Sequence, residues 1–208
     1  MALPTTENNT SELIEKALSK AVTYEDYRAM VHQLALEGKA TGPVQTEALA
    51  NYTMLNDRRM KRFDKTVKLS VEDVDTIAKL DKKIQLIVLT ESWCGDAAPA
   101  MPVINKVALL NENIDFKVVL RDENVALMNQ FLTNGAMSIP KLIFWDEENQ
   151  EVFADWGPRP APAAKLVTDH KEKHGQLLPE IKEEIQQWYN KDKGQTTLKE
   201  VLTCLSLK

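Results

Sequence analysis

The sequence is poor in cysteine, glycine and aromatic residues, and it contains no long hydrophobic run. Its two cysteines among 208 residues, Cys94 and Cys204, are too few for a disulfide framework and fit a reducing compartment. Seven glycines and nine prolines exclude a collagen-like or linker-like chain. The longest strongly apolar run, residues 86–89, is far shorter than the ~20 residues that a membrane span requires. The chain is therefore expected to be neither fibrous nor membrane-spanning.

The composition is that of a globular protein, with 43% hydrophobic and 27% charged residues. A net charge of −5 argues against a dedicated nucleic-acid binder, which would normally be basic. The first ten residues lack the basic and apolar segments of a signal peptide. We therefore expect a cytoplasmic protein with neither nucleic acid nor a membrane as its partner.

Hydrophobic periodicity divides the chain into a helical first third, an α/β middle and a helical end. One apolar stripe in the first third is interrupted by Asn56 and consists of Leu49, Tyr52, Met60 and Phe63. A second stripe, in the helical end, consists of Leu178, Ile181, Ile185 and Trp188. The expected strands cover residues 84–89, 114–120, 141–145 and 151–154, and the helices between them cover residues 97–111 and 125–132. A strand–helix–strand crossover requires parallel strands and a hairpin requires antiparallel ones, so this βαβαββα order predicts a mixed sheet with helices on both faces. We expect a helical N-terminal extension over residues 1–68, and an α/β domain with C-terminal helices over residues 69–208.

Cys94 lies where the first expected strand turns into a helix, in the segment Trp93-Cys94-Gly95-Asp96. Ligands of open α/β sheets bind at the carboxyl ends of strands. Backbone N–H groups at a helix N-terminus lower a thiol pKa, whereas the neighbouring carboxylate of Asp96 raises it. The sequence does not decide the sign of the net shift, and an inert, buried Cys94 is the alternative interpretation.

Three separated motifs resemble the thioredoxin family. Trp93-Cys94-Gly95, with Pro102 eight residues after the cysteine, is similar to the family's W-C-G-P-C segment and kinked helix. Ser138-Ile139-Pro140 before an apolar strand resembles its cis-proline loop, and Gly157 matches its third substrate-facing loop. The resemblance covers residues 70–175. It implies a thioredoxin-like fold, a cis bond before Pro140 and a groove in which Ile139 offers its backbone to a substrate.

Two departures from the family pattern change the expected chemistry. Ala97 replaces the second active-site cysteine, and Val88 replaces the family's buried aspartate. The resemblance then implies monothiol thiol–disulfide exchange through Cys94, with a protein or a low-molecular-weight thiol as partner and without cofactor or metal. The alternative is a non-catalytic binding module that uses the thioredoxin groove.

If the chain has the thioredoxin-like groove that the resemblance implies, seven residues near Cys94 are expected to bind the substrate. They are Trp93, Gly95, Asp96, Ile139, Pro140, Gly157 and Arg159. Arg159 either acts in the cleft, where it lowers the thiol pKa or holds a substrate carboxylate, or is an exposed loop arginine. Trp156 either walls the cleft or belongs to the core.

Three further features are interpreted as structural. Cys204, in a leucine-rich tail segment, is expected to be a packed or partly exposed structural cysteine. His170 and His174 share a helix face but lack the further ligands that zinc requires. The basic cluster over residues 58–68 is interleaved with aspartates, which favours a solvated helix face.

Overall fold

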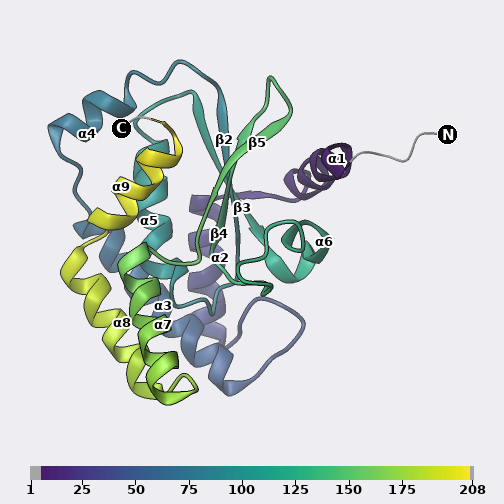
Figure 1. Ribbon diagram of the computed structural model, residues 1–208. Coiled ribbons are helices and arrows are strands. Elements are labelled where there is room, and N and C mark those ends of the chain that lie inside the picture. The colour runs from purple at the N-terminus through teal and green to yellow at the C-terminus, as the bar shows by residue number, and fades with distance from the viewer. Residues whose placement is uncertain (1–5, 207–208) are drawn as a thin grey trace.

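The computed structural model describes residues 6–206, and its sheet lies between two layers of helices (Figure 1). The N-terminal helices are α1 (Thr6–Leu18), α2 (Tyr24–Glu37), α3 (Glu47–Thr66) and α4 (Val71–Ile77). The strands are β1 (Val22–Thr23), β2 (Ile84–Thr90), β3 (Ile114–Leu120), β4 (Lys141–Asp146) and β5 (Glu151–Trp156). The remaining helices are α5 (Ala97–Ala108), the 3-10 turn Arg121–Glu123, α6 (Val125–Met128), α7 (Ala161–His174), α8 (Pro179–Asp192) and α9 (Gln195–Cys204).

The sheet has the strand order β1-β3-β2-β4-β5 and mixes parallel with antiparallel pairs. Strand β2 pairs in parallel with β3 and antiparallel with β4, and β4 forms a hairpin with β5. The four expected strands and the mixed sheet are confirmed. The sequence did not indicate β1, which contributes only two residues and pairs antiparallel with β3.

Helices cover both faces of the sheet, with α5 and α9 on one side and α1 and α6 on the other (Figure 1). Strand β2 is buried on both faces, as its apolar run predicts. Tyr27 of α2 and Met60 of α3 belong to the same hydrophobic core as Leu86 of β2 and Met101 of α5. The N-terminal helices therefore share a core with the sheet. The boundary expected at residue 68 stays a prediction.

Two helices differ from the sequence expectation. Helix α6 ends at Met128, not at residue 132, because the chain turns into a small bridge between Thr133 and Ala136 through left-handed residues 134 and 135. On α8 the buried side chains are Ile181, Ile185 and Tyr189, whereas the expected stripe ended at Trp188. No helix within residues 6–206 is long and apolar enough to cross a membrane.

Candidate functional site

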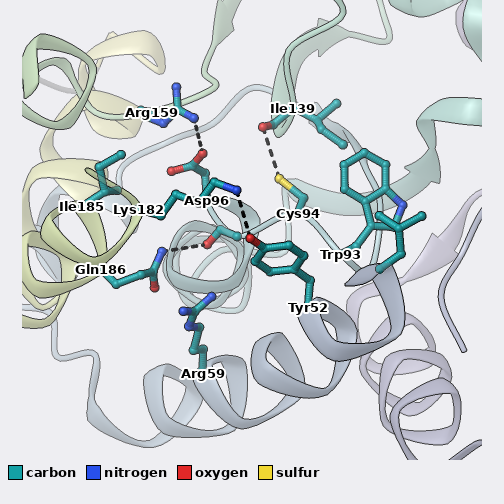
Figure 2. A pocket seen from close by; sticks show the side chains of 12 residues that line it. Tyr52, Arg59, Trp93, Cys94, Asp96, Ile139, Arg159, Lys182, Ile185 and Gln186 are labelled. Atoms are coloured by element: carbon teal, nitrogen blue, oxygen red, sulfur yellow. Dashed lines mark hydrogen bonds and ion pairs between the residues drawn. The ribbon is translucent and has the colours of Figure 1, made fainter. Parts of the chain in front are cut away.

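Cys94 lies between the end of β2 and the start of α5, at the carboxyl edge of the sheet. Its side chain is buried, with only 6% of the residue exposed. The Cys94 thiol donates a hydrogen bond to the backbone carbonyl of Ile139 across a distance of 3.2 Å (Figure 2). The cysteine and the loop before β4 therefore face one another.

The electrostatic surroundings of Cys94 favour the protonated thiol. Burial and the negative charge of Asp96 raise the pKa of Cys94 to about 12. Backbone N–H groups of Ala97 and Asp96 and the positive charge of Arg159 lower this pKa, but their effect is smaller. The net pKa shift of Cys94, whose sign the sequence left open, is therefore upward. Cys94 is a neutral hydrogen-bond donor in this conformation.

Asp96 is the most connected polar residue beside the thiol. Its carboxylate pairs with the Arg159 guanidinium at 2.7 Å and accepts a hydrogen bond from the Tyr189 hydroxyl at 3.1 Å (Figure 2 shows the ion pair). Burial raises the pKa of Asp96, and the pairing with Arg159 opposes that shift. Arg159 is therefore no exposed loop arginine: its positive charge is directed at Asp96.

A pocket of about 430 Å³ opens beside Cys94. Six of the eight expected site residues line it, namely Trp93, Cys94, Gly95, Asp96, Ile139 and Arg159. The other lining residues come from two helices that the motifs did not implicate: Leu49, Tyr52 and Arg59 of α3, and Lys182, Ile185 and Gln186 of α8 (Figure 2). One helix from the N-terminal third of the chain and one from its C-terminal part therefore form walls of the pocket beside the thiol.

Pro140 and Gly157 support the pocket without lining it. Pro140 is buried and Gly157 has a φ of +119°, a conformation that side chains rarely adopt. A Cβ on residue 157 would overlap the carbonyl oxygen of Pro140. The Ile139–Pro140 and Gly157–Pro158 bonds are both cis. The glycine therefore allows the loop after β5 to lie directly on the loop that carries Ile139.

Arg59 was expected on a solvated helix face, and that expectation is wrong. Its guanidinium lies in the pocket and donates a hydrogen bond to Asn56 at 3.1 Å. A Cβ on Gly95 would be 3.8 Å from this guanidinium, which is an ordinary van der Waals distance. Desolvation lowers the pKa of Arg59, but an arginine keeps its charge at neutral pH.

The N-terminal segments also hold the loop between β2 and Cys94. Asn56 of α3 donates to the carbonyl of Ser92 at 2.9 Å, and the Ser92 hydroxyl bonds to Thr53 at 2.8 Å. The Thr41 hydroxyl donates to the buried carboxylate of Glu91, which also accepts from the N–H of Asp122 at 2.9 Å. The only sequence signal for these contacts was a polar residue, Asn56, in an apolar stripe.

Other candidates lie outside the pocket. Trp156 is buried and donates to Glu200 at 2.7 Å, so it belongs to the core. Cys204 is partly buried at the end of α9, and both cysteines are unpaired. The His170 ring accepts a hydrogen bond from the Leu178 N–H at 3.3 Å. Among the described residues no group of three or more histidine, cysteine or acidic side chains could hold a metal ion.

A family model described as thioredoxin matches residues 42–172, which is more than half of the chain. The chain belongs to the thioredoxin family. The match begins within the segment before α3, so it includes the helix that carries Asn56 and Arg59 as well as the expected motifs. No curated protein matches this thioredoxin-family chain significantly.

Two solved structures have the same fold as this thioredoxin-family protein. One is a protein of unknown function from Pseudomonas aeruginosa, 17% identical, with a TM-score of 0.57 over 73% of this chain and 84% of that one. The other is an HIV epitope-scaffold, 15% identical, with a TM-score of 0.55 over 89% of this chain and 98% of that one. At these identities the likeness concerns the fold alone.

Proposed function

We propose that this protein carries out thiol–disulfide exchange through the single nucleophile Cys94. The observation that supports it best is the geometry of the thiol, which lies just before helix α5 and faces the Ile139 carbonyl beside a pocket. Ala97 occupies the position of a second cysteine, so the enzyme is monothiol and its mixed disulfide requires an external thiol for release. We further propose that it works in the cytoplasm, where thiols are available, and needs no metal, nucleic acid or membrane.

In the proposed reaction, Cys94 reacts first with a disulfide and then with an external thiol. The Cys94 sulfur attacks one sulfur of the disulfide, so a new S–S bond forms on Cys94 and the original S–S bond breaks. Cys94 is oxidised, the departing sulfur is reduced, and the departing thiolate takes up the proton that the Cys94 thiol lost. A second thiol then attacks the mixed disulfide, which returns Cys94 to the thiol and releases the bound group as a new disulfide.

The second candidate function is binding without turnover. It is favoured by the pKa of Cys94, which burial and Asp96 raise to about 12, because little thiolate then exists at neutral pH. Exchange in this protein therefore depends on partner binding to change the surroundings of the thiol. A binding module would leave the thiol protonated and unreactive with the partner in place.

The two candidates differ in whether Cys94 becomes covalently modified. The reduced Cys204→Ser protein, incubated with 2-hydroxyethyl disulfide near neutral pH, is expected to gain the mass of one mercaptoethanol group. Dithiothreitol should remove that mass, and the Cys94→Ser, Cys204→Ser double variant should not gain it. A folded Cys204→Ser protein that gains no mass, while the same chain in urea does, would favour the binding module.

A further inference from the structure

The thiol is enclosed in a way that limits the size of its partner. Cys94 is 6% exposed, and α3 on one side and α8 on the other contribute six of the twelve residues that line its pocket. The resulting volume of about 430 Å³ is in the range of small-ligand pockets, ~300–1,000 Å³. With so little of Cys94 exposed, a small disulfide reaches the sulfur more readily than a disulfide held on the surface of a folded protein.

The pocket carries more positive than negative charge. Its charged lining residues are the cations Arg59, Arg159 and Lys182 and the single carboxylate Asp96. Arg159 is paired with Asp96 at 2.7 Å, so its charge is largely neutralised. Arg59 and Lys182 have no carboxylate within ion-pair distance among the side chains that the structure describes, and two positive charges are left for a ligand.

These two cations retain free hydrogen-bond donors. Arg59 uses a guanidinium N–H for Asn56 at 3.1 Å, and four of the five donors of an arginine stay available for a carboxylate. Lys182, exposed at the mouth of the pocket, donates to the Tyr52 hydroxyl at 3.0 Å, and its ammonium lies 5.3 Å from the Tyr52 ring centre. Figure 2 shows both side chains on the Asp96 side of the thiol.

We propose that the partner of Cys94 is a low-molecular-weight disulfide that carries a carboxylate, and that Arg59 and Lys182 bind this carboxylate. The inference rests on the exchange reaction proposed above and names its substrate class. The rings of Trp93 and Tyr52 and the side chain of Ile139 supply apolar walls for the stem between sulfur and carboxylate. The sulfur of the ligand then meets Cys94 while its charged end meets α3 and α8.

Three symmetrical disulfides that differ in charge test the proposal. They are 3,3'-dithiodipropionate, with carboxylates, 2-hydroxyethyl disulfide, which is neutral, and cystamine, with ammonium groups. The rate of mixed-disulfide formation at Cys94 is measured by intact mass in the full-length Cys204→Ser background. Comparing each variant with its parent for the same reagent cancels the intrinsic reactivity of that reagent.

Arg59→Gln is expected to slow the reaction with dithiodipropionate about tenfold, because one attractive charge is lost. Arg59→Gln together with Lys182→Gln should slow it further, and the rate with the neutral disulfide should change by less than about twofold. The parent's preference should shrink between about 0.02 M and about 0.5 M salt, as screening predicts. Arg58→Gln, an exposed neighbour on the same helix, should leave all three rates unchanged.

The outcomes separate this inference from the function on which it rests. If all three disulfides modify Cys94 but Arg59→Gln slows them equally or not at all, exchange stands and carboxylate recognition is overturned. If none of them modifies Cys94 in the folded protein while the unfolded chain reacts, the exchange function fails and the inference with it. A tenfold loss confined to dithiodipropionate supports both.

Discussion

The guanidinium of Arg159 lies 2.7 Å from the carboxylate of Asp96, which ties the loop after β5 to the residue just before the first turn of α5. The pair places both signs of charge beside one thiol. Asp96 raises the pKa of Cys94 and Arg159 lowers it, with burial the largest contribution. The reactivity of Cys94 should therefore respond in opposite directions to the loss of each partner.

Removing the negative charge with Asp96→Asn should lower the pKa of Cys94 and speed its alkylation. The wild-type thiol pKa of about 12 means that the rate with iodoacetamide rises about tenfold per pH unit across the neutral and mildly alkaline range. The variant should react about tenfold faster near pH 7, with its pH profile displaced to lower pH. Intact mass spectrometry over a pH series measures both.

Tyr189→Phe is the matched control for that change. It removes the 3.1 Å hydrogen bond to Asp96 but keeps the negative charge, so the alkylation profile should stay close to that of the wild type. Equal acceleration by both variants would show that the loss of packing, and not of charge, exposes the thiol.

Arg159→Gln should have the opposite effect on Cys94 and should destabilise the fold. It leaves the Asp96 carboxylate buried without its cation, at a cost of about 2 kcal/mol in the free energy of unfolding. Alkylation of Cys94 near pH 7 should slow. The double variant Asp96→Asn, Arg159→Gln should recover part of the lost stability in urea denaturation, because no unpaired charge remains. Additive losses in the double variant would show that the two side chains do not interact.

The sequence predicted the parts of the site that lie in local motifs. Short runs of adjacent residues predicted the strand before Cys94, the helix after it and the loop at Ile139. Arg59 did not, because it is one of six basic residues in residues 58–68, and only the docking of α3 against α5 decides which of them faces the pocket. Asn56 looked like a break in an apolar stripe because its partner, the Ser92 carbonyl, is 36 residues away.

The spacing of apolar residues on α8 could not predict that Tyr189 contributes to the site. Trp188 and Tyr189 are adjacent and both apolar enough to end the stripe on α8, and helical spacing from Ile185 allows either. Tyr189 is the buried residue of the two, because its hydroxyl donates a hydrogen bond to the buried Asp96 carboxylate. Spacing within the helix cannot reveal this preference, since Asp96 lies 93 residues away in the sequence.

Gly157→Ala should lower the free energy of unfolding far more than Gly38→Ala. Both glycines have positive φ, +119° and +65°, so each substitution incurs a backbone cost of about 1 kcal/mol. At Gly38 nothing lies within 4 Å of the added Cβ, whereas at Gly157 it would overlap the backbone oxygen of Pro140. We expect a loss of about 3 kcal/mol or more at Gly157, measured by urea denaturation. Similar losses at both positions would show that the two loops separate easily.

Ala97→Cys should create a disulfide with Cys94 in the Cys204→Ser background. Residue 97 lies three positions after Cys94, and its backbone N–H faces the Cys94 sulfur, which places the two side chains on the same side of the helix start. The Cα separation should then fall within the ~4.4–6.8 Å that a disulfide tolerates.

Mild oxidant should convert this variant into a form with one intramolecular disulfide and no free thiol, as measured by mass after alkylation. The new thiol can also expel a bound group from Cys94, so the variant should reduce disulfides without an external thiol for the release step. With dithiothreitol present to reduce the intramolecular disulfide after each cycle, turnover should stay low, because Val88 supplies no buried carboxylate to accept a proton. Two free thiols under oxidant would mean that the Cys94 sulfur points away from residue 97, and the assignment of this helix start as a thioredoxin-type site would then be wrong.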